Sequence, residues 1–367
     1  MNKKLITAVI VLTLAIPTAA SAAIKNQNSL APTIAILDTG IDDTLPNLQG
    51  KIVQEVCILE WNTCPNGTSF MEGPHAAVVP SNIINLNGFD HGTQMASVFV
   101  ATNPNANIVF IKIIGNTTAG IRQNAGEASV YKALNWVKAN AAQYNIQAVS
   151  MSQGHHNFTS ATDYCPKTPI TEQAVKDLMT MQIPVFFPSG NGRDYSRIDW
   201  PACIDASVSV GYVDQQNEIS TSSNVDSAKL DFFALGFFTI ASPGNVLKNI
   251  SGSSSATQVA AAQWIAFKTS KPSATYDQIL TSFKNTASST VGRQGTFTKL
   301  LNLNAALSYT LPQAGPTAAD IAAAKAKLQA EVNAGLAEAD AQYQIELKAA
   351  QDKLAATRAQ WLAKLNG

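Results

Sequence analysis

The sequence predicts an α/β fold, a doubly wound and mostly parallel sheet flanked by helices, with a long α-helical extension at the C-terminus. Three observations lead to this prediction. Short apolar runs end at glycine-bearing turns, helix-like stretches alternate with them, and the last 51 residues change abruptly in composition. Strands that are apolar throughout are typical of a sheet covered on both faces, and strand–helix alternation is typical of parallel strand order.

Five segments predict buried strands, and two segments between them predict helices. The strands are TIAILDTG from Thr33, NIVFIKIIG from Asn107, IQAVSMSQG from Ile146, IPVFFPSGNG from Ile183 and ASVSVGYVD from Ala206. The helices cover residues 126–144 and 170–181. In an open α/β sheet, functional side chains lie beyond the carboxyl ends of the strands, so the residues that end these runs are the first candidates for a site.

The first 22 residues predict a secretory signal peptide. Lys3 and Lys4 precede an apolar stretch over residues 5–16, and small residues follow up to Ala22. Because a membrane-spanning helix needs about 20 apolar residues, this stretch is too short to be an anchor. We therefore expect an exported mature chain that begins at Ala23, in the periplasm or outside the cell, with no membrane span after cleavage. Only residues 23–32 separate this cleavage site from the first strand, so we expect no N-terminal pro-domain.

The composition predicts a folded protein that does not bind nucleic acid. Lysine plus arginine and aspartate plus glutamate each number 25, so the formal net charge is zero and there is no overall attraction for a polyanion. Hydrophobic residues make up 46% of the chain and charged residues 14%. This balance is typical of a packed core, which we place in one domain over residues 23–311.

Export places the four cysteines in an oxidising compartment, where they can pair in three ways. We favour Cys57 with Cys64 and Cys165 with Cys203. The first two lie within one short segment, CILEWNTC, whose following Pro-Asn-Gly is typical of a loop that a bridge could close. Neither pair has the C-x-x-C spacing of a zinc site.

Residues 312–316 predict a linker, and residues 317–367 predict an alanine-rich amphipathic helix. This tail holds 17 alanines and 12 charged residues. Its larger residues recur at a spacing of eleven, at Ile321, Val332, Tyr343, Leu354 and Leu365, and this period is typical of a nearly straight helix or a slightly right-handed coiled coil. Two interpretations remain open: the helix packs on its own domain or extends into solvent, or its apolar stripe pairs with another copy or a different partner.

Four short motifs follow one another at strand ends and helix starts. They are Asp38-Thr39-Gly40 after the first strand, His91-Gly92-Thr93 before a helical run, Ser189-Gly190-Asn191-Gly192 after the fourth strand, and Gly252-Ser253-Ser254-Ser255-Ala256 before an alanine-rich helix. Each motif alone is weak. Their order along the chain, Asp then His then Asn then Ser, is what points to nucleophilic catalysis by a serine.

This set of motifs resembles the subtilisin-like serine protease family, over roughly residues 33–307. The resemblance implies a subtilisin-like fold and a peptidase domain that hydrolyses polypeptides without a cofactor. It implies that Asp38 orients the general base His91, that Ser254 is the nucleophile, and that Asn191 stabilises the oxyanion. The Cys165–Cys203 pairing also resembles many secreted members of the family.

The nucleophile motif departs from the family pattern G-T-S-M-A-x-P. Ser253 and Ser255 replace threonine and methionine, and Gln258 stands where proline is expected. Ser253 and Ser255 are thus rival hydroxyls, but the alignment of Gly252 and Ala256 with the family motif favours Ser254. These changes lower the specificity of the motif without removing a reacting atom.

The resemblance further implies that an extended peptide substrate pairs with two segments of the chain. We expect the substrate-binding residues to be Ser150, Met151, Ser152, Gly154, Gly115 and Gly120, with Gly154 and the residues before Asn191 lining the primary specificity pocket. Relatives often bind structural calcium, to which Asp42, Asp43 or Asp194 could contribute here, although no calcium-ligand loop is legible. We interpret His155-His156 as a solvated loop and not as a metal site.

Two functions from different classes therefore compete. The first is an exported serine endopeptidase, favoured by the complete set Asp38, His91, Asn191 and Ser254. The alternative is a catalytically silent protein of the same fold that binds peptides or assembles through its C-terminal helix, suggested by the altered serine motif and the tail. An esterase of the α/β-hydrolase type is excluded, because the chain lacks a G-x-S-x-G elbow around Ser254 and the order Ser, acid, His.

Overall fold

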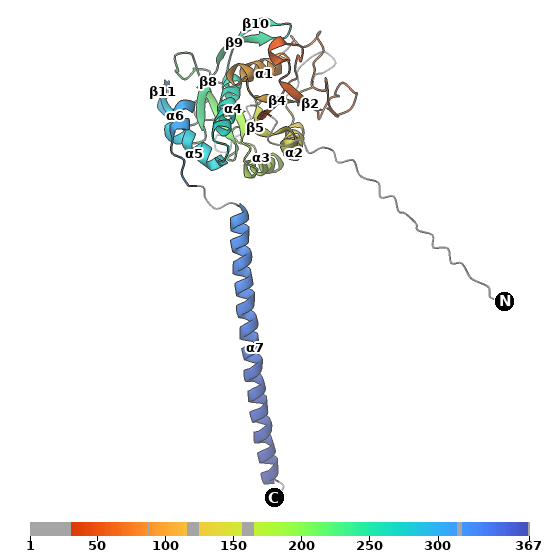
Figure 1. Cartoon of the computed structure of the whole chain (residues 1–367), viewed down its shortest axis with the longest axis vertical. Coiled ribbons are helices and arrows are strands. Elements are labelled where there is room, and N and C mark those ends of the chain that lie inside the picture. The colour runs from red at the N-terminus through yellow and green to blue at the C-terminus, as the bar shows by residue number, and fades with distance from the viewer. Residues whose placement is uncertain (1–30, 87, 116–124, 156–164, 314–317, 366–367) are drawn as a thin grey trace, which may run out of the picture. The chain divides into compact units, whose positions relative to one another are not determined.

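The computed structural model describes residues 31–86, 88–115, 125–155, 165–313 and 318–365. The predicted signal peptide and Gly120 lie outside the described residues. The described chain forms two units, one that ends at Leu311 and a second that begins at Pro312. Figure 1 shows the elements of both units with their labels.

The first unit is built on a ten-stranded sheet in the order β11-β12-β8-β7-β6-β5-β1-β4-β2-β3. Neighbouring strands are parallel except β2 with β3 and β11 with β12. Its strands are β1 (Thr33–Asp38), β2 (Ile52–Ile58), β3 (Phe70–Glu72), β4 (Asn107–Lys112), β5 (Ile146–Met151), β6 (Val185–Pro188), β7 (Val208–Val213), β8 (Phe232–Leu235), β11 (Ser288–Gly292) and β12 (Gly295–Leu300). A separate antiparallel hairpin joins β9 (Phe237–Ser242) to β10 (Val246–Ser251).

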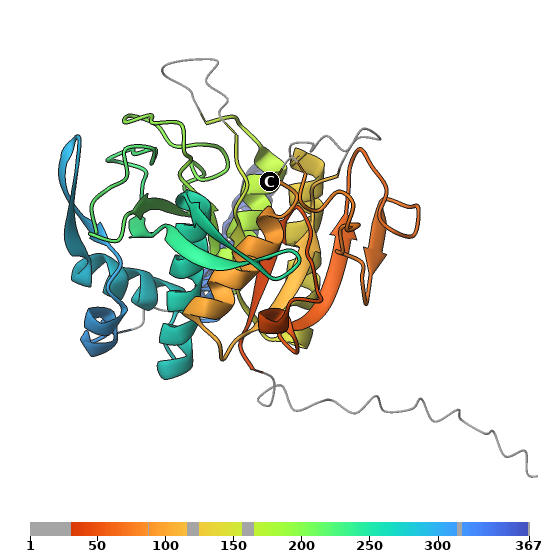
Figure 2. The ribbon, with the colours of Figure 1, turned by 90° about the horizontal axis from the view of Figure 1, so that it is seen from above.

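Helices cover both faces of this sheet, as the continuous apolar strands predict. They are α1 (His91–Thr102), α2 (Glu127–Tyr144), α3 (Pro169–Thr180), α4 (Ser253–Ser270), α5 (Tyr276–Thr286) and α6 (Leu303–Ser308), with a short 3-10 helix at Pro46–Leu48. Alternate residues of β1 divide between two cores: Ile34 and Ile36 pack with α1 and α4, and Ala35 and Leu37 pack with α2 and α3. Figure 2 shows the sheet with helices on both of its faces. The predicted α/β class and mostly parallel sheet are therefore confirmed.

The strand order brings the candidate motifs together at the carboxyl ends of the central strands. β1 lies between β4 and β5, so the chain moves to one side of β1 and then to the other. A site in this type of fold forms at such a reversal, beyond the carboxyl ends of the strands. Asp38 ends β1 beside Lys112 of β4, and β5 and β6 end next to them at Met151 and Pro188.

Two disulfides close loops in the first unit, and they have the pairing that the sequence predicts. Cys57 bonds to Cys64 and Cys165 bonds to Cys203, with Cα atoms 5.9 and 5.7 Å apart. The first bridge ties the end of β2 to the following loop. The second joins the loop before α3 to the segment before β7. Its two cysteines are 38 positions apart in the sequence, and the loop that they close includes β6.

The second unit consists of α7 (Ala318–Leu365), a single helix of 48 residues. The predicted tail helix is present, and the described large residues of its eleven-residue stripe are exposed, from Ile321 at 46% to Leu354 at 71%. An alanine-rich helix of this length is about 72 Å long. Within the described part of the chain, no helix is long and apolar enough to cross a membrane.

Candidate functional site

Asp38 and His91 form an acid–imidazole pair at the carboxyl end of β1, in which the aspartate is buried and the imidazole is 22% exposed. Asp38 is fully buried at the end of β1, and its two carboxylate oxygens lie 2.8 and 3.0 Å from Nδ1 of His91, the first residue of α1. The backbone N–H of Thr39 donates to Asp38 Oδ1 at 2.7 Å. Because Nδ1 faces the carboxylate, Nε2 is the ring nitrogen left for chemistry.

The Thr39 hydroxyl and Gly92 hold the backbone around Asp38 and His91 in place. The hydroxyl of Thr39 donates to the carbonyl of Phe89 at 2.9 Å and accepts the N–H of Gly92 at 3.0 Å, which joins the segment after β1 to the start of α1. A Cβ at Gly92 would lie 2.3 Å from the carbonyl oxygen of Gly40. Only glycine therefore permits the close approach that seats His91 against Asp38.

Gln153 belongs to this cluster, although no local motif distinguishes it in the sequence. Its amide Nε2 donates to Asp38 Oδ1 at 2.8 Å and lies 3.0 Å from His91 Nδ1. The residue is buried and follows the predicted substrate strand β5. Asp38 Oδ1 thus receives three donors, and such bonds hold a carboxylate in a single orientation.

Ser254 lies in the first turn of α4 and is tied to the end of β5. Its hydroxyl donates to the carbonyl of Ser152 at 3.2 Å, and the Ser152 hydroxyl donates back to the carbonyl of Ser254 at 2.9 Å. In the part of the chain that the structure describes, no hydrogen bond joins Ser254 to His91. The two side chains nevertheless contact consecutive residues of one segment, Ser254 contacting Ser152 and His91 contacting Gln153.

The rival serines are engaged or buried. Ser253 is 0% exposed, its hydroxyl donates to Asn191 Oδ1 at 3.1 Å, and it accepts the N–H of Gly190 at 3.2 Å. Ser255 is 1% exposed, whereas Ser254 is partly exposed. Among these three neighbours, Ser254 has the side chain that an incoming substrate can reach.

Gln258, which replaces the expected proline, is a buried crosslink between α4 and β5. Its Nε2 donates to the hydroxyls of Ser150 and Ser152 at 2.8 and 2.9 Å. Ser152 in turn bonds to Ser254, so Gln258 and Ser254 hold the same serine from one helix. The residue that departs from the family motif therefore joins α4 to the end of β5 by two hydrogen bonds.

Asn191 follows β6 and points its oxygen at the start of α4. Its Oδ1 accepts the backbone N–H of Ser253 at 3.0 Å as well as the hydroxyl of the same residue. With the oxygen occupied in this way, the Asn191 NH₂ is left as a donor. The Nδ2 atom lies 3.2 Å from the position of a Cβ on Gly252, whose φ of +150° is one that side chains disfavour.

Lys112, the residue beside Asp38 on β4, is a buried cation next to the pair. Its Nζ donates to the carbonyl of Thr39 at 2.7 Å. Burial lowers the pKa of Lys112 from 10.5 to about 8, and the Asp38 carboxylate opposes this shift. The sequence marked Lys112 only as one residue of an apolar strand, because a tertiary contact of this kind leaves no local pattern.

Because of Lys112, the free energy of unfolding should increase with pH in the alkaline range. Its folded pKa of about 8 lies below the value of 10.5, so between these values the unfolded chain holds more protons and the free energy of unfolding rises with pH. Burying the Lys112 ammonium lowers the free energy of unfolding by about 3 kcal/mol below pH 8, and this destabilisation disappears as the pH approaches 10.5. We expect wild type to gain this amount relative to Lys112→Met between pH 7 and 10.5, measured by urea unfolding in a Ser254→Ala background. A constant difference between the two chains would contradict the assignment.

The remaining predicted residues are those expected to bind the substrate and the histidine that follows them. Met151 ends β5 and is fully buried, so it can offer a substrate only its backbone. Gly115 follows β4 and is buried. At Gly154, a Cβ would lie 2.8 Å from the carbonyl oxygen of Trp200. The prediction that His155 and His156 form a solvated loop holds only in part for His155, which is half-buried: its ring lies 4.9 Å from the Trp200 ring, and burial lowers its pKa. His156 lies outside the described residues.

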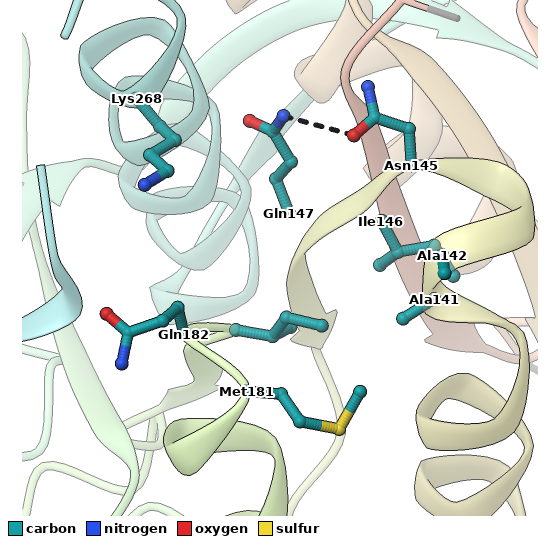
Figure 3. A pocket seen from close by; sticks show the side chains of 9 residues that line it. Ala141, Ala142, Asn145, Ile146, Gln147, Met181, Gln182 and Lys268 are labelled. Carbon is teal, nitrogen blue, oxygen red and sulfur yellow. Dashed lines mark hydrogen bonds between the residues drawn. The ribbon is translucent and has the colours of Figure 1, made fainter. Parts of the chain in front are cut away.

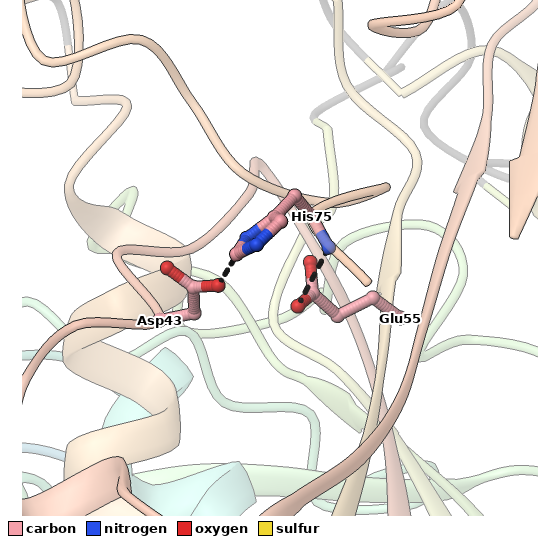
Figure 4. Close-up of side chains that lie close together, drawn as sticks. All are labelled: Asp43, Glu55 and His75. Carbon is pink, nitrogen blue, oxygen red and sulfur yellow. Dashed lines mark hydrogen bonds and ion pairs between the residues drawn. The ribbon is translucent and has the colours of Figure 1, made fainter. Parts of the chain in front are cut away.

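One group of side chains has the composition of a metal site, but it does not fit calcium. Within the described residues, Asp43, Glu55 and His75 are the only group of three acidic, histidine or cysteine side chains with ligand atoms within 4.8 Å of one another (Figure 4). His75 Nδ1 lies 2.7 Å from Asp43 Oδ2, and both Glu55 oxygens accept backbone N–H groups, from His75 and Ala77. Calcium takes six to eight oxygen ligands, and these bonds already satisfy the group.

Asp194, another residue suggested for calcium, is engaged in its own loop. Its carboxylate accepts the backbone N–H of Ser196 and pairs with Arg197 at 2.8 Å. Bonds to Ser196 and Arg197 lower the pKa of Asp194 against the opposing effect of burial. Asp42 accepts from Thr44 and from the N–H of Gly244. We therefore assign no metal to these residues.

A pocket of about 380 Å³ lies far from the candidate site, at the other end of the same strands (Figure 3). It lies where β5 begins, at Ile146, and just before β6, at Ile183. Gln147 donates to Asn145 across its rim at 3.3 Å. Its lining combines neutral amides with Lys268 and offers no acid–base pair, so it does not compete with Asp38 and His91 as a catalytic centre.

Comparison with known proteins identifies the class. The model of the subtilase family matches residues 30–310. The chain therefore belongs to the subtilase family, whose members are subtilisin-like serine proteases. This finding confirms the resemblance that the four motifs indicate.

Individual relatives are more distant. The chain is 29% identical over 266 residues to an alkaline protease of Alkalihalobacillus alcalophilus, a match covering 70% of this chain and 59% of that protein. It is also 29% identical to Subtilisin Savinase of Lederbergia lenta, covering 70% of this chain and 83% of the relative. A protease of Pseudoalteromonas arctica has a similar fold, with a TM-score of 0.61 and 18% identity over 77% of this chain and 92% of its own.

Proposed function

We propose that this chain is an exported serine endopeptidase that hydrolyses peptide bonds through Ser254, His91 and Asp38. The proposal depends on one observation: Asp38, His91 and Ser254 all contact the short segment that follows β5. In that segment, Gln153 contacts Asp38 and His91, and Ser152 is hydrogen-bonded to Ser254. Membership of the subtilase family supports the same reaction. No cofactor is needed for it, because the side chains supply both nucleophile and base.

The attack begins when the Ser254 hydroxyl turns from the Ser152 carbonyl to Nε2 of His91. A serine hydroxyl is a weak nucleophile at neutral pH, so His91 takes its proton as the oxygen attacks the peptide carbonyl. The Asp38 carboxylate holds Nδ1–H, which fixes the tautomer and stabilises the imidazolium. His91 then returns the proton to the leaving amine, and water repeats the sequence on the acyl-enzyme.

Asn191 and the backbone N–H of Ser254 bind the oxyanion. The amide NH₂ of Asn191 is left as a donor because Ser253 occupies its oxygen. Ser254 N–H is one of the first four of α4, which have no partner within a helix. A donor of this kind lowers the barrier by about 3 kcal/mol. The extended substrate pairs with the backbone of Ser150 to Ser152 and with the segment that follows Gly115.

The tail is treated as an accessory in this proposal. The exposed apolar stripe of α7 is suited to pairing with a second copy of the helix or with a partner, and the catalytic residues all lie in the first unit. The signal peptide, whose residues lie outside the described part of the chain, would deliver the protein across the membrane.

Hydrolysis of unfolded casein tests the function. We would compare the chain from Ala23 onward with its Ser254→Ala variant and with a version that ends at Leu311. We expect the first and third to cleave casein and the Ser254→Ala variant to be inert. If the full chain is inert and the shortened one cleaves, the tail restrains the site. If all three are inert while folded, the catalytically silent alternative replaces this proposal.

A further inference from the structure

The apolar stripe of α7 is exposed along its described length. Its large side chains follow the eleven-residue repeat and the turns between the repeats, at Ile321, Leu328, Val332, Leu336, Tyr343, Leu347, Leu354 and Trp361. An eleven-residue period keeps such residues on one side of a nearly straight helix, and an exposed apolar surface of this extent marks an interaction site. The stripe is therefore suited to lie along a second straight helix with the same period.

A row of charged residues beside the stripe indicates which helix this is. Glu331, Gln342 and Lys353 are spaced by eleven residues, and each directly precedes a residue of the stripe. In the sequence, the same spacing extends the row to Asp320 and Lys364. The row thus changes from acidic to basic at Gln342, which lies beside the midpoint of the helix. A row whose charge reverses about its centre is complementary to itself when it is turned end for end.

The charge of the whole helix divides in the same way. Residues 318–342 contain four acidic and two basic residues, and residues 343–365 contain two acidic and four basic residues. An antiparallel pair of α7 helices places each acidic half against the basic half of the other copy, whereas a parallel pair places like halves together. Charged residues that flank the apolar stripe set the orientation of a coiled coil in this way.

We propose that α7 pairs with α7 of a second copy of this chain, in an antiparallel arrangement with Gln342 opposite Gln342. Such a pair has two-fold symmetry, so every contact between different residues is made twice. Glu331 of each copy then lies opposite Lys353 of the other copy. Both side chains are on the exposed helix, where the only described ion pair of Glu331 is one of 4.0 Å with Lys327.

The apolar stripe fits the same register. With Gln342 opposite itself, Leu336 of one copy lies beside Leu347 of the other. Tyr343 lies beside Ala339, so that a large side chain meets a small one at the centre of the pair. The register that matches the charges therefore also matches the sizes of the apolar side chains.

Lys325 and Arg358 are the two basic residues within the stripe, and this register brings them near each other. Their long side chains can cover apolar surface while the charged ends stay in water. The contact weakens the pair but does not favour the other orientation, because a parallel pair would bring Lys325 beside Lys325 of the second copy.

Charge reversal at two positions separates the antiparallel pair from the alternatives. Glu331→Lys places like charges opposite each other twice in each dimer, and so does Lys353→Glu. The two substitutions in one chain restore opposite charges at both contacts. In a parallel pair, residue 331 stays opposite residue 331 and neither reversal changes a match into a mismatch. Asp352→Lys is the matched control, since it makes the same change of charge one residue from Lys353, on the side of the helix away from the stripe.

The experiment measures the dimer dissociation constant of each intact mature chain by sedimentation equilibrium at physiological salt. All chains carry Ser254→Ala, which prevents self-cleavage. We expect the chain without reversals to form a dimer and each single reversal to weaken it by about tenfold, the combined effect of two exposed charge contacts. The double variant should return to within about twofold of the starting value, and Asp352→Lys should stay there.

Three results would overturn the proposal. A chain without reversals that remains monomeric over the whole concentration series shows that the stripe faces solvent or takes a different partner. A dimer that Glu331→Lys weakens no more than Asp352→Lys does is not antiparallel in this register. A double variant no tighter than the single ones shows that Glu331 and Lys353 are not opposite each other. None of these measurements uses catalysis, so their failure leaves the proposed function untouched.

Discussion

Replacing Ser254 with alanine should lower kcat for peptide hydrolysis by about 10⁶-fold, which corresponds to about 8 kcal/mol of barrier. The loss is large because no other described hydroxyl is placed to react: Ser253 is bonded to Asn191, and Ser255 is buried. The remaining rate would come from the oxyanion donors and substrate binding alone. Steady-state kinetics on a chromogenic peptide measures this effect.

Ser255→Ala is the matched control for this variant. It removes a hydroxyl from the next residue of the same helix turn without touching the pair formed by Asp38 and His91. We expect its kcat to stay within about tenfold of wild type, since the substitution changes only buried packing. If Ser254→Ala kept more than about 1% of the activity and Ser255→Ala lost it, the nucleophile would have to be reassigned.

Replacing Asp38 with asparagine should lower kcat by about 10⁴-fold with little change in KM. In the native chain, Oδ1 receives N–H donors from Thr39, Gln153 and His91. An amide at this position must present an NH₂ group to some of these donors, which favours the wrong tautomer of His91. The variant should remain folded, because the side chain keeps its shape and burial.

Asp42→Asn serves as the control for the Asp38 variant. Asp42 lies four residues further on, and its carboxylate bonds to Thr44 and Gly244 and not to His91. Its kcat should stay near that of wild type. An Asp38→Asn variant with normal kcat would remove Asp38 from the mechanism, and a rise in KM alone would make it a residue that shapes substrate binding.

The sequence predicted the buried half of the fold better than its edges. β1, β4, β5 and β6 are central strands covered on both faces, so each has a largely apolar run that a glycine follows within a few residues. The hairpin of β9 and β10 was not predicted, because polar residues interrupt β10 and most of its side chains are exposed, such as Leu247 at 70%. The strands β3 and β8 were missed because they are short, with three and four residues.

The candidate site was predicted where its residues belong to local motifs and was missed where they act through tertiary contacts. Asp38, His91, Asn191 and Ser254 each follow a strand or start a helix, and glycines mark them. Gln153 and Lys112 reach the site only because distant strands are adjacent in the sheet. Gln258 was noticed as a missing proline, yet its bonds to Ser150 and Ser152 could not be read from its position in the sequence.

The most direct test of the central claim is covalent labelling of the intact mature chain with a fluorophosphonate, followed by peptide mapping in a mass spectrometer. Such reagents react with a serine only when a base activates it, so the label reports the chemistry and not merely exposure. We predict one modified residue, Ser254, and no label in Ser254→Ala or after denaturation. A folded chain that stays unlabelled, or that carries the label on another serine, would contradict the account.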